Sequence, residues 1–462
     1  MSDLAILFCG FMTIALAVIN IPLLFLGVVY FGRRNAPVKT DRRKGAPPSV
    51  SVVIPFHNEK KRLAGTLQSV ISQSARIGEI ILMDDGSSDG YEAVLHDHFD
   101  FQEENASGFP DDAPDNAQGI KKYRLRERGR MRPHEGPWER LERIFLYKTL
   151  NQGKSKALDL GFHLAEGELV VTVDADGLLL PDAIERLIAP FGGDKNLIAT
   201  FGSLGVLHED AAAMHGKAHR QGQLPGTLFQ RMQLCSMMND FMLTPAYNRF
   251  DLHYWIVGAF ATFRKESILR IGGFSNRTLT EDRDICLDIY ANTLPRRSGA
   301  IKHIPGAICL TELPAGPLDL MGQQTRWHGG WYQTLVKYRA LIFNPRLPGL
   351  GLVMLPMQVL KAAVTALLWL HALAVTVLLL TASPLAGPCL GAILAYWLVR
   401  FVSVGYYHLI GSRHFFTHRL YTPAEHKRLL LDYTLIYPFF VLFYSFSASR
   451  AFLFFLGNKL RW

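Results

Sequence analysis

Two carboxylates, one residue apart, follow a strongly apolar run near the middle of the chain. The stretch "ELVVTVDADG" places Asp174 and Asp176 directly after residues that are typical of a buried strand. A hard divalent cation takes oxygen ligands and commonly shares them with phosphate oxygens. At a strand end, one carboxylate can face a metal while the other turns toward a sugar or ribose. D-x-D alone is usually a turn, but this position indicates a metal site.

A second acidic pair follows another apolar run. The stretch "GEIILMDDGSSDG" ends a predicted strand at Asp84 and Asp85 and continues into a loop of glycine, serine and aspartate. The loop can be a plain turn built from turn-forming residues. Its functional interpretation is a nucleotide pocket, in which carboxylates accept hydrogen bonds from a base or ribose. Farther on, "NQGKSKAL" places Lys154 near a helix start, where backbone N–H groups and cations suit phosphates.

The elements that hold these residues alternate between strand and helix. We expect strands at "SVSVVIPF", "EIILM", "RIFLYKTL" and "ELVVTV", with helical patterns at "EKKRLAGTLQSVISQS" and in "NQGKSKALDLGFHLAEG". Such alternation is typical of βαβ units and predicts an α/β domain with a Rossmann-like, mostly parallel sheet. Ligands of these sheets bind beyond the carboxyl ends of the strands. All four aspartates occupy such ends, which favours one shared site.

Residues 93–142 form an unusually long connection between two of the predicted strands. Its first part is acidic and contains glycine and proline, and its second part, "KKYRLRERGRMR", is basic. Connections of this length are either functional or flexible. We expect a mobile, solvated insertion, and a lid or a partner-docking element is the alternative.

The chain also contains apolar runs that are long enough to cross a bilayer. Of its 462 residues, 49% are hydrophobic and only 19% are charged, because the charges are absent from long stretches. A membrane-spanning helix needs about 20 apolar residues. The first run begins with Asp3 and is followed by basic residues, which favours a retained anchor over a cleaved signal peptide. We expect spans near residues 5–29, 362–382, 389–410 and 433–456.

The distribution of basic residues predicts the orientation and excludes other classes. The basic segment after the first run places the chain up to Lys361 in the cytoplasm. The net charge of +9 is therefore mostly a membrane effect. The sequence shows no basic face with interleaved aromatic residues, so nothing in it indicates nucleic-acid binding.

The five cysteines are scattered without metal-ligand spacing, so the sequence supports neither a zinc site nor a disulfide framework.

Further motifs follow in a fixed order around these clusters. The chain contains "VVIPFHNE", "DDGSSD", "NQGKSKAL", "DADG", "GAFATFRKE", "GGFSNRTLTEDRDICLDI" and "QQTRW". From about Ser49 to Trp331, the chain resembles the family 2 glycosyltransferases of the GT-A fold. More narrowly, it resembles their membrane-integrated synthases of cellulose, hyaluronan, chitin oligosaccharides and poly-N-acetylglucosamine. The resemblance implies a hexosyltransferase with a cytoplasmic GT-A domain and about four transmembrane helices.

The resemblance also implies roles for individual residues. Asp282, in the T-E-D segment that begins at Thr280, would be the catalytic base. The residues that would bind the nucleotide sugar are Pro55, Glu59, Asp84, Asp85, Lys154, Asp174, Asp176, Gln323 and Arg326. Glu281 and Trp327 would bind the acceptor. Asp176 and Asp174 would hold Mg²⁺ or Mn²⁺. His57 departs from the pattern, because many relatives carry an aromatic residue there.

The implied function is an inverting transfer from a UDP-sugar that builds a β-linked polysaccharide at the membrane, in a processive manner coupled to export. The alternative is a glycolipid synthase that resembles ceramide glucosyltransferases and adds one sugar to a membrane lipid. A membrane-anchored binding protein with an inactive transferase fold is the third class. The intact Asp176, Asp282 and Arg326 argue against that third class.

These expectations define an organisation and a set of partners. We expect an anchor at 1–31, a basic linker at 32–48, the GT-A domain at 49–331, an interfacial segment at 332–361 and transmembrane helices at 362–462. The expected partners are a UDP-sugar, a polysaccharide or lipid acceptor, the bilayer and a small membrane subunit, with no nucleic acid. The expected location is a bacterial inner membrane, with the catalytic domain in the cytoplasm.

Overall fold

The structure is a computed structural model of the 462-residue chain. It describes isolated residues within 8–12 and 387–398 and the segments 48–97, 99–104, 120–127, 143–207, 224–293, 299–381 and 421–457. The chain divides into two compact units. The sheet unit comprises Val38–Arg220 and Trp255–Glu312, and the helical unit comprises Met1–Pro37, Gln221–Tyr254 and Leu313–Trp462. The domain boundaries expected from the sequence remain a proposal.

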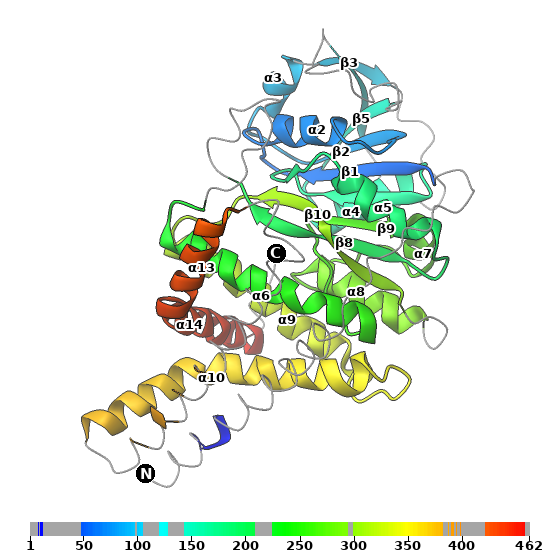
Figure 1. The fold of residues 1–462 in the computed structure, drawn as a ribbon. Helices are drawn as coiled ribbons and strands as arrows, with labels where there is room; N and C mark the ends of the chain where they lie inside the picture. Colours follow the sequence, from blue (N-terminus) through cyan, green and yellow to red (C-terminus); the bar gives the residue numbers. More distant parts are fainter. Residues whose placement is uncertain are drawn as a thin grey trace. The chain divides into compact units, whose positions relative to one another are not determined.

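The sheet unit is built on one mixed sheet, with ten strands in the described part of the chain (Figure 1). Their order across the sheet is β3-β4-β5-β2-β1-β6-β9-β8-β10-β7. The strands are β1 (Val50–Phe56), β2 (Glu79–Asp85), β3 (Phe99–Glu104), β4 (Lys121–Glu127), β5 (Arg143–Thr149), β6 (Leu169–Val173), β7 (Leu178–Leu179), β8 (Ala199–Val206), β9 (Phe260–Arg264) and β10 (Ile301–Thr311). The four strands expected from the sequence correspond to β1, β2, β5 and β6.

The α/β fold class is confirmed, and the parallel part of the sheet is the β5-β2-β1-β6 core, together with the β8-β10 pair. The remaining pairs are antiparallel, so the whole sheet is more mixed than the sequence pattern predicts. The reason is that β3 and β4 interrupt the βαβ alternation within residues 49–173 with an antiparallel pair, and β9 follows α6 in the chain and pairs antiparallel with β6 and β8. Antiparallel neighbours need no crossover helix.

Short helices cover the faces of the sheet, and apolar side chains fill the space between. These helices are α2 (Leu63–Ile71), α3 (Tyr91–His96), α4 (Lys154–Leu164), α5 (Ala183–Ile188), η3 (Ala189–Gly192), α7 (Lys265–Arg270) and α8 (Glu281–Thr293). All seven residues of β1 are buried. The apolar side of α2 expected from the sequence is buried as well, with Leu67 and Val70 fully inaccessible. This core fixes the strand ends that carry the aspartates.

The insertion at 93–142 contributes β structure to the sheet. Its described residues 99–104 and 121–127 form β3 and β4, and β4 pairs antiparallel with β5. The ring of Phe101 stacks on His96, with 4.1 Å between ring centroids. These residues are therefore an ordered extension of the sheet, which differs from the solvated loop expected for them. Residues 105–119 and 128–142 lie outside the described residues.

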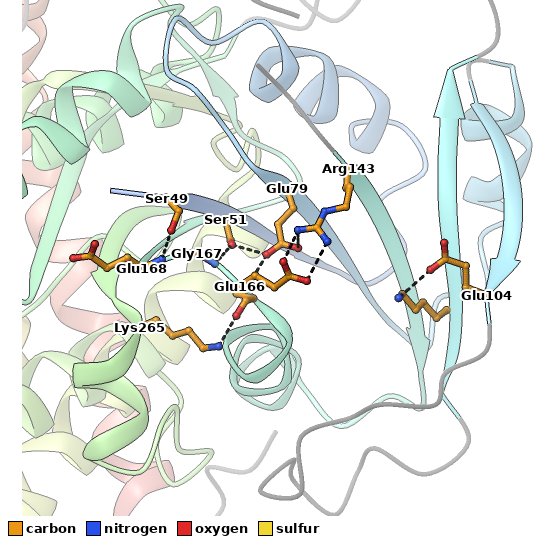
Figure 2. Close-up of polar contacts among 11 residues, drawn as sticks. Ser49, Ser51, Glu79, Glu104, Arg143, Glu166, Gly167, Glu168 and Lys265 are labelled. Carbon is orange, nitrogen blue, oxygen red and sulfur yellow. Dashed lines mark hydrogen bonds and ion pairs between the residues drawn. The ribbon is translucent and has the colours of Figure 1, made fainter. Parts of the chain in front are cut away.

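A polar network around the buried Glu79 joins the starts of the central strands (Figure 2). The aspartates lie at the opposite ends of these strands. Glu79 is 3% exposed, and its Oε1 accepts hydrogen bonds from Ser51 Oγ at 2.7 Å and from Glu166 N at 2.6 Å. Arg143 reaches toward the other Glu79 oxygen at 4.0 Å and pairs with the Glu166 carboxylate. Strands β1, β2 and β5 are thus fastened to the loop before β6.

The helical unit is a set of long helices. They are α6 (Leu228–Phe250), α9 (Pro317–Lys337), α10 (Leu355–Leu380), α13 (Pro423–Leu435) and α14 (Tyr437–Leu456), with short turns η5 (Arg339–Leu341) and η6 (Leu350–Met354). Arg231 of α6 donates to Asp432 of α13 at 2.7 Å. Tyr332 of α9 donates to the Ala448 carbonyl of α14 at 3.1 Å. Trp369 of α10 donates to Ser449 of α14 at 2.6 Å.

Two helical stretches in the described part of the chain are long and apolar enough to cross a membrane. They are Leu350–Leu380 and Phe439–Leu456. They overlap the spans expected near 362–382 and 433–456. The spans expected near 5–29 and 389–410 lie largely outside the described residues. The number of four spans therefore stays a prediction.

The network around Glu79 generates a prediction about stability. Glu79→Ala leaves the Glu166 amide and the Ser51 hydroxyl without their buried acceptor and removes a nearby opposite charge from Arg143. It should lower the free energy of unfolding by about 2–4 kcal/mol. Glu79→Gln keeps an acceptor oxygen and should cost less. Pulse proteolysis of the full chain in urea measures the difference.

Glu104→Ala is the matched control, because Glu104 pairs with Lys122 in the same sheet and its side chain is 33% exposed, against 4% for Glu79. Exposed pairs contribute at most about 1 kcal/mol. An equal loss in Glu79→Ala and Glu104→Ala would contradict a stabilising role for the buried network.

Candidate active site

The D-x-D pair lies in a tight turn directly after β6. The Asp174 amide donates to the Ala259 carbonyl at 3.0 Å, and the Gly177 amide donates back to the Asp174 carbonyl at 2.9 Å. Thr311 Oγ1 donates to Asp176 Oδ2 at 3.2 Å. A Cβ atom on Gly177 would lie 2.8 Å from Cys309 Sγ, so only glycine fits without a shift of its neighbours. The turn thereby presents both carboxylates at the carboxyl end of β6.

Lys154 joins the D-x-D turn to the T-E-D segment. Its Nζ lies 2.6 Å from Asp174 Oδ1 and 2.9 Å from Glu281 Oε1. Lys154 is the first residue of α4, and Glu281 is the first residue of α8. Three residues that are far apart in the sequence thus form one ionic cluster, which we call the Lys154 triad.

Electrostatics in this region favour a bound cation. Burial raises the pKa of Asp174 to about 6, although the Lys154 charge opposes the shift, and Asp176 raises it further. Burial also raises the pKa of Glu59 to about 7, with further contributions from Asp176 and Asp174. Burial by itself lowers the pKa of Lys154, but the Asp174 and Glu281 carboxylates raise it by more. Negative charge is thus in excess around these carboxylates, despite the half-buried ammonium of Lys154.

The chemistry of the donor set fits a hard divalent ion. Asp176 and Asp174 offer carboxylate oxygens, which Mg²⁺ and Mn²⁺ prefer. No cluster of three or more histidine, cysteine or acidic side chains suited to a metal occurs among the described residues. A site built on these two aspartates would therefore complete its coordination with oxygens from a ligand or from water.

Asp282 lies beside the triad, in the first turn of α8. Its Oδ1 accepts a hydrogen bond from the Arg283 amide at 2.7 Å. Burial raises the pKa of Asp282, and the neighbouring Glu281 charge raises it further. A Cβ atom on Gly258 would lie 3.0 Å from Asp282 Cβ and 3.3 Å from Glu281 Oε1. Gly258 thus leaves the space that both carboxylates occupy.

Asp84 and Asp85, at the carboxyl end of β2, hold the loop after β2 and the loop before α4 in place. Asp84 accepts hydrogen bonds from the Ser87 amide at 2.7 Å and from Tyr91 Oη at 2.8 Å. Asp85 accepts from the Gln152 and Gly153 amides at 2.7 Å and 2.8 Å. Both residues are buried, at 4% and 5% exposed. Each of their carboxylate oxygens already accepts a bond from the protein, so the binding of a base by these groups stays a prediction.

A polar, exposed group lies at the same edge of the sheet. His57 Nδ1 lies 2.9 Å from the Asp85 carbonyl oxygen, and Asn58 Nδ2 lies 2.9 Å from His57 Nε2. Asn151 Nδ2 lies 3.2 Å from His57 Nδ1. Asn58 adopts a left-handed backbone, with φ 57°. Pro55 is buried within β1, whereas Glu59 follows in the turn before α2 and is half-buried.

The Q-x-x-R-W residues lie on α9, in the helical unit. Gln323 Oε1 accepts a hydrogen bond from Gln233 Nε2 of α6 at 2.5 Å. Arg326 is exposed and Trp327 is half-buried. That these residues share one site with Asp176 and Asp282 stays a prediction. The sequence did not predict the contact between Gln233 and Gln323, because the two residues are far apart in the chain and belong to no common motif.

Three further residues lie at or near the site that were not predicted as site residues from the sequence. Thr311 touches Asp176 and Gly258 lies against Asp282, whereas Asn151 touches His57, which is outside the predicted set. None of the three belongs to an acidic or basic cluster. Gly258 and Asn151 begin the motifs "GAFATFRKE" and "NQGKSKAL", so the sequence carried a signal for these two residues. Thr311 ends a long strand with no pattern of its own, so only the fold brings it to Asp176.

The Lys154 triad generates a second prediction. Lys154→Met leaves the Asp174 and Glu281 carboxylates without their shared counter-charge, and should lower the free energy of unfolding by about 1–3 kcal/mol. The double variant Lys154→Met/Glu281→Gln should recover part of that loss, and a double-mutant cycle in thermal unfolding measures the coupling. Lys156→Met, two residues along the same helix, is the control. Strict additivity would mean that the 2.9 Å contact carries no energy.

Two bacterial poly-beta-1,6-N-acetyl-D-glucosamine synthases are similar in sequence to this chain. Poly-beta-1,6-N-acetyl-D-glucosamine synthase of Staphylococcus aureus (strain COL) is 22% identical over 328 residues, which are 71% of this chain and 64% of that protein. The synthase of Staphylococcus epidermidis (strain ATCC 35984) is 23% identical over 304 residues, which are 66% of this chain and 59% of that protein. The aligned part thus spans less than two thirds of these relatives.

A solved structure shows the same fold. Mannosyltransferase PcManGT from Pyrobaculum calidifontis, in complex with GDP-Man and Mn²⁺, superposes with a TM-score of 0.56 and 16% sequence identity. The match covers 97% of this chain and 100% of that one. Residues 51–110 match the family described as "Glycosyl transferase family 2", and residues 169–407 match "Glycosyl transferase family group 2". The second match covers more than half of the sequence, and the chain therefore belongs to the family 2 glycosyltransferases.

Proposed function

We propose that this protein is a membrane-bound, inverting hexosyltransferase that uses a UDP-sugar to build a β-linked polysaccharide, in a processive reaction coupled to export. The observation that carries the proposal is the Lys154 triad, which brings the D-x-D turn and the T-E-D segment together. The resemblance to poly-beta-1,6-N-acetyl-D-glucosamine synthases supports a polysaccharide product. The two apolar helices support a membrane location, for which we propose a bacterial inner membrane.

The donor side of the site is proposed to bind a nucleotide sugar. Asp176 and Asp174 would hold Mg²⁺ or Mn²⁺, and the bound ion would supply positive charge to the leaving diphosphate. The fold neighbour PcManGT is a complex with GDP-Man and Mn²⁺, in keeping with this assignment. Lys154 keeps Asp174 in place through its 2.6 Å contact. The exposed fork of Arg326 suits phosphate oxygens, and Gln323 would lie beside it.

The acceptor side is proposed to be served by Asp282. A general base is most effective when its pKa is close to the working pH, and burial raises the pKa of Asp282 in that direction. The Asp282 carboxylate would take the proton of the acceptor hydroxyl as that oxygen attacks the anomeric carbon. Lys154 fixes Glu281 next to it, where Glu281 and Trp327 would bind the acceptor. Attack without a covalent enzyme intermediate inverts the anomeric centre, so an α-linked donor gives a β-linked product.

One experiment tests this proposal and its alternatives. Membranes that contain the full chain are incubated with a panel of labelled UDP-sugars and with labelled GDP-mannose for comparison. A high-mass product that stays in the aqueous phase is expected. A product that extracts into organic solvent would instead indicate a glycolipid synthase, and the absence of transfer from every donor would indicate an inactive binding protein.

The role of Asp282 gives a third prediction. Asp282→Asn should lower transfer by about 10²–10⁴-fold, because the proton acceptor is lost. The binding of UDP should remain largely intact, since this carboxylate is assigned to the acceptor. Asp288→Asn, on the same helix, makes the same chemical change away from the triad and should stay active. Wild-type turnover in Asp282→Asn would contradict the assignment of the base.

The role of Asp176 gives a fourth prediction. Asp176→Ala removes a primary oxygen ligand and should weaken the metal-dependent part of UDP binding. Titration calorimetry with UDP and Mn²⁺, repeated with a chelator, separates that part from metal-independent binding. Asp182→Ala is the control, because Asp182 pairs with Arg186 at the surface. Equal affinities of Asp176→Ala and wild type would move the metal to other residues.

A further inference from the structure

Phe343 combines two properties that conflict in a soluble fold. Its backbone is left-handed, with φ 61°, a conformation in which a bulky L side chain crowds the following carbonyl. Its side chain is nevertheless 71% exposed, so packing against the protein does not explain the choice of residue. Glycine or asparagine would adopt this backbone more easily. A strained, exposed aromatic residue points to a use of the ring outside the fold.

The loop around Phe343 is tightly held. The Phe343 amide donates to the Gly351 carbonyl at 2.8 Å, and the Gly351 amide donates to the Leu347 carbonyl at 2.6 Å. A Cβ atom on Gly351 would lie 2.5 Å from the Asn344 carbonyl oxygen, and one on Gly349 would lie 2.4 Å from the Phe250 carbonyl oxygen. Such close backbone approaches leave the loop little freedom. The outward position of Phe343 is therefore a built feature.

The loop that carries this ring, and the neighbouring end of α6, also carry exposed cationic side chains. Arg339 and Arg346 are exposed in the same loop, and Arg249 and Phe250 are exposed at the end of α6, which packs against Gly349. The sequence from residue 333 to residue 360 contains no aspartate or glutamate. Asp251 follows Phe250 at the end of α6, and the group still keeps a net positive charge.

The loop leads directly into a membrane-crossing candidate. Leu352 and Val353 are 45% and 46% exposed, and they belong to the apolar stretch Leu350–Leu380. Cations and an aromatic ring at one end of such a stretch occupy the depth at which lipid headgroups meet acyl chains.

We propose that residues 339–353, here called the interfacial loop, bind anionic phospholipid headgroups together with Arg249. The Phe343 ring and the Leu352 side chain enter the boundary of the acyl chains, and Arg339 and Arg346 pair with headgroup phosphates. The fixed loop sets the depth of α10 in the bilayer. This inference stands apart from the proposed reaction, because it concerns the lipid surface alone.

Lipid retention tests the proposal. The full chain is reconstituted in phosphatidylcholine with a minority of phosphatidylglycerol, extracted in neutral detergent, and the two lipids that remain bound are quantified by mass spectrometry. Wild type should be enriched in phosphatidylglycerol at low salt and lose the enrichment at high salt. Arg339→Gln/Arg346→Gln should weaken this preference by roughly 25-fold, at about five-fold for each arginine. Arg270→Gln, on an exposed arginine of the sheet unit, should change nothing.

Two further measurements exclude a purely structural role. Phe343→Gly relieves the left-handed backbone, so it should raise the thermal midpoint in neutral detergent and yet lower lipid retention. If retention stays unchanged in both Phe343→Gly and the double arginine variant, the proposal is wrong. Displacement of phosphatidylglycerol by glycerol phosphate at constant ionic strength would also overturn it, since that result indicates a site for free phosphate.

Discussion

The contact of one ammonium with two carboxylates is the constraint on which the rest of the site depends. Lys154 lies within 3 Å of both Asp174 and Glu281, and these residues come from the start of α4, the turn after β6 and the start of α8. Removal of charge from water is costly unless an opposite charge compensates it. The ammonium at the start of α4 compensates the charge of the two acidic segments that meet there, and these segments carry Asp176 and Asp282.

The same contact explains why a cation suits the remaining carboxylates. Lys154 supplies one positive charge, whereas Asp174, Asp176, Glu281 and Asp282 supply four negative ones. Burial is the main reason that the pKa values of Asp174 and Glu59 are raised, and the charge of Asp176 raises both further. The diphosphate of a nucleotide sugar would add further negative charge, and a divalent ion would neutralise part of the charge of both the carboxylates and the diphosphate. The carboxylate cluster therefore suits an anionic ligand that binds together with a divalent cation.

The sequence predicted those parts of the structure that repeat locally. Strands β1, β2, β5 and β6 were visible as β-branched runs, and the aspartates were visible because they end such runs. The antiparallel pairing of β6 with β9 was not predictable, since the chain leaves for α6 before β9 forms and no local period records that detour. The contacts of Thr311 with Asp176 and of Gln233 with Gln323 have the same origin. These contacts depend on packing between distant segments, and the spacing of residues in a single sequence does not predict such packing.

The hydrogen bonds of Asp85 change how mutations at this position have to be interpreted. Its carboxylate holds the Gln152 and Gly153 amides, and the next residue is Lys154. The position of Lys154 in the triad therefore depends on the hydrogen bonds of Asp85 at the end of β2. A substitution of Asp85 releases the start of α4 and so displaces the ammonium from its partners. An inactive Asp85 variant would then report a shifted lysine as readily as a lost nucleotide contact, and measurement of the Lys154 pKa in that variant separates the two explanations.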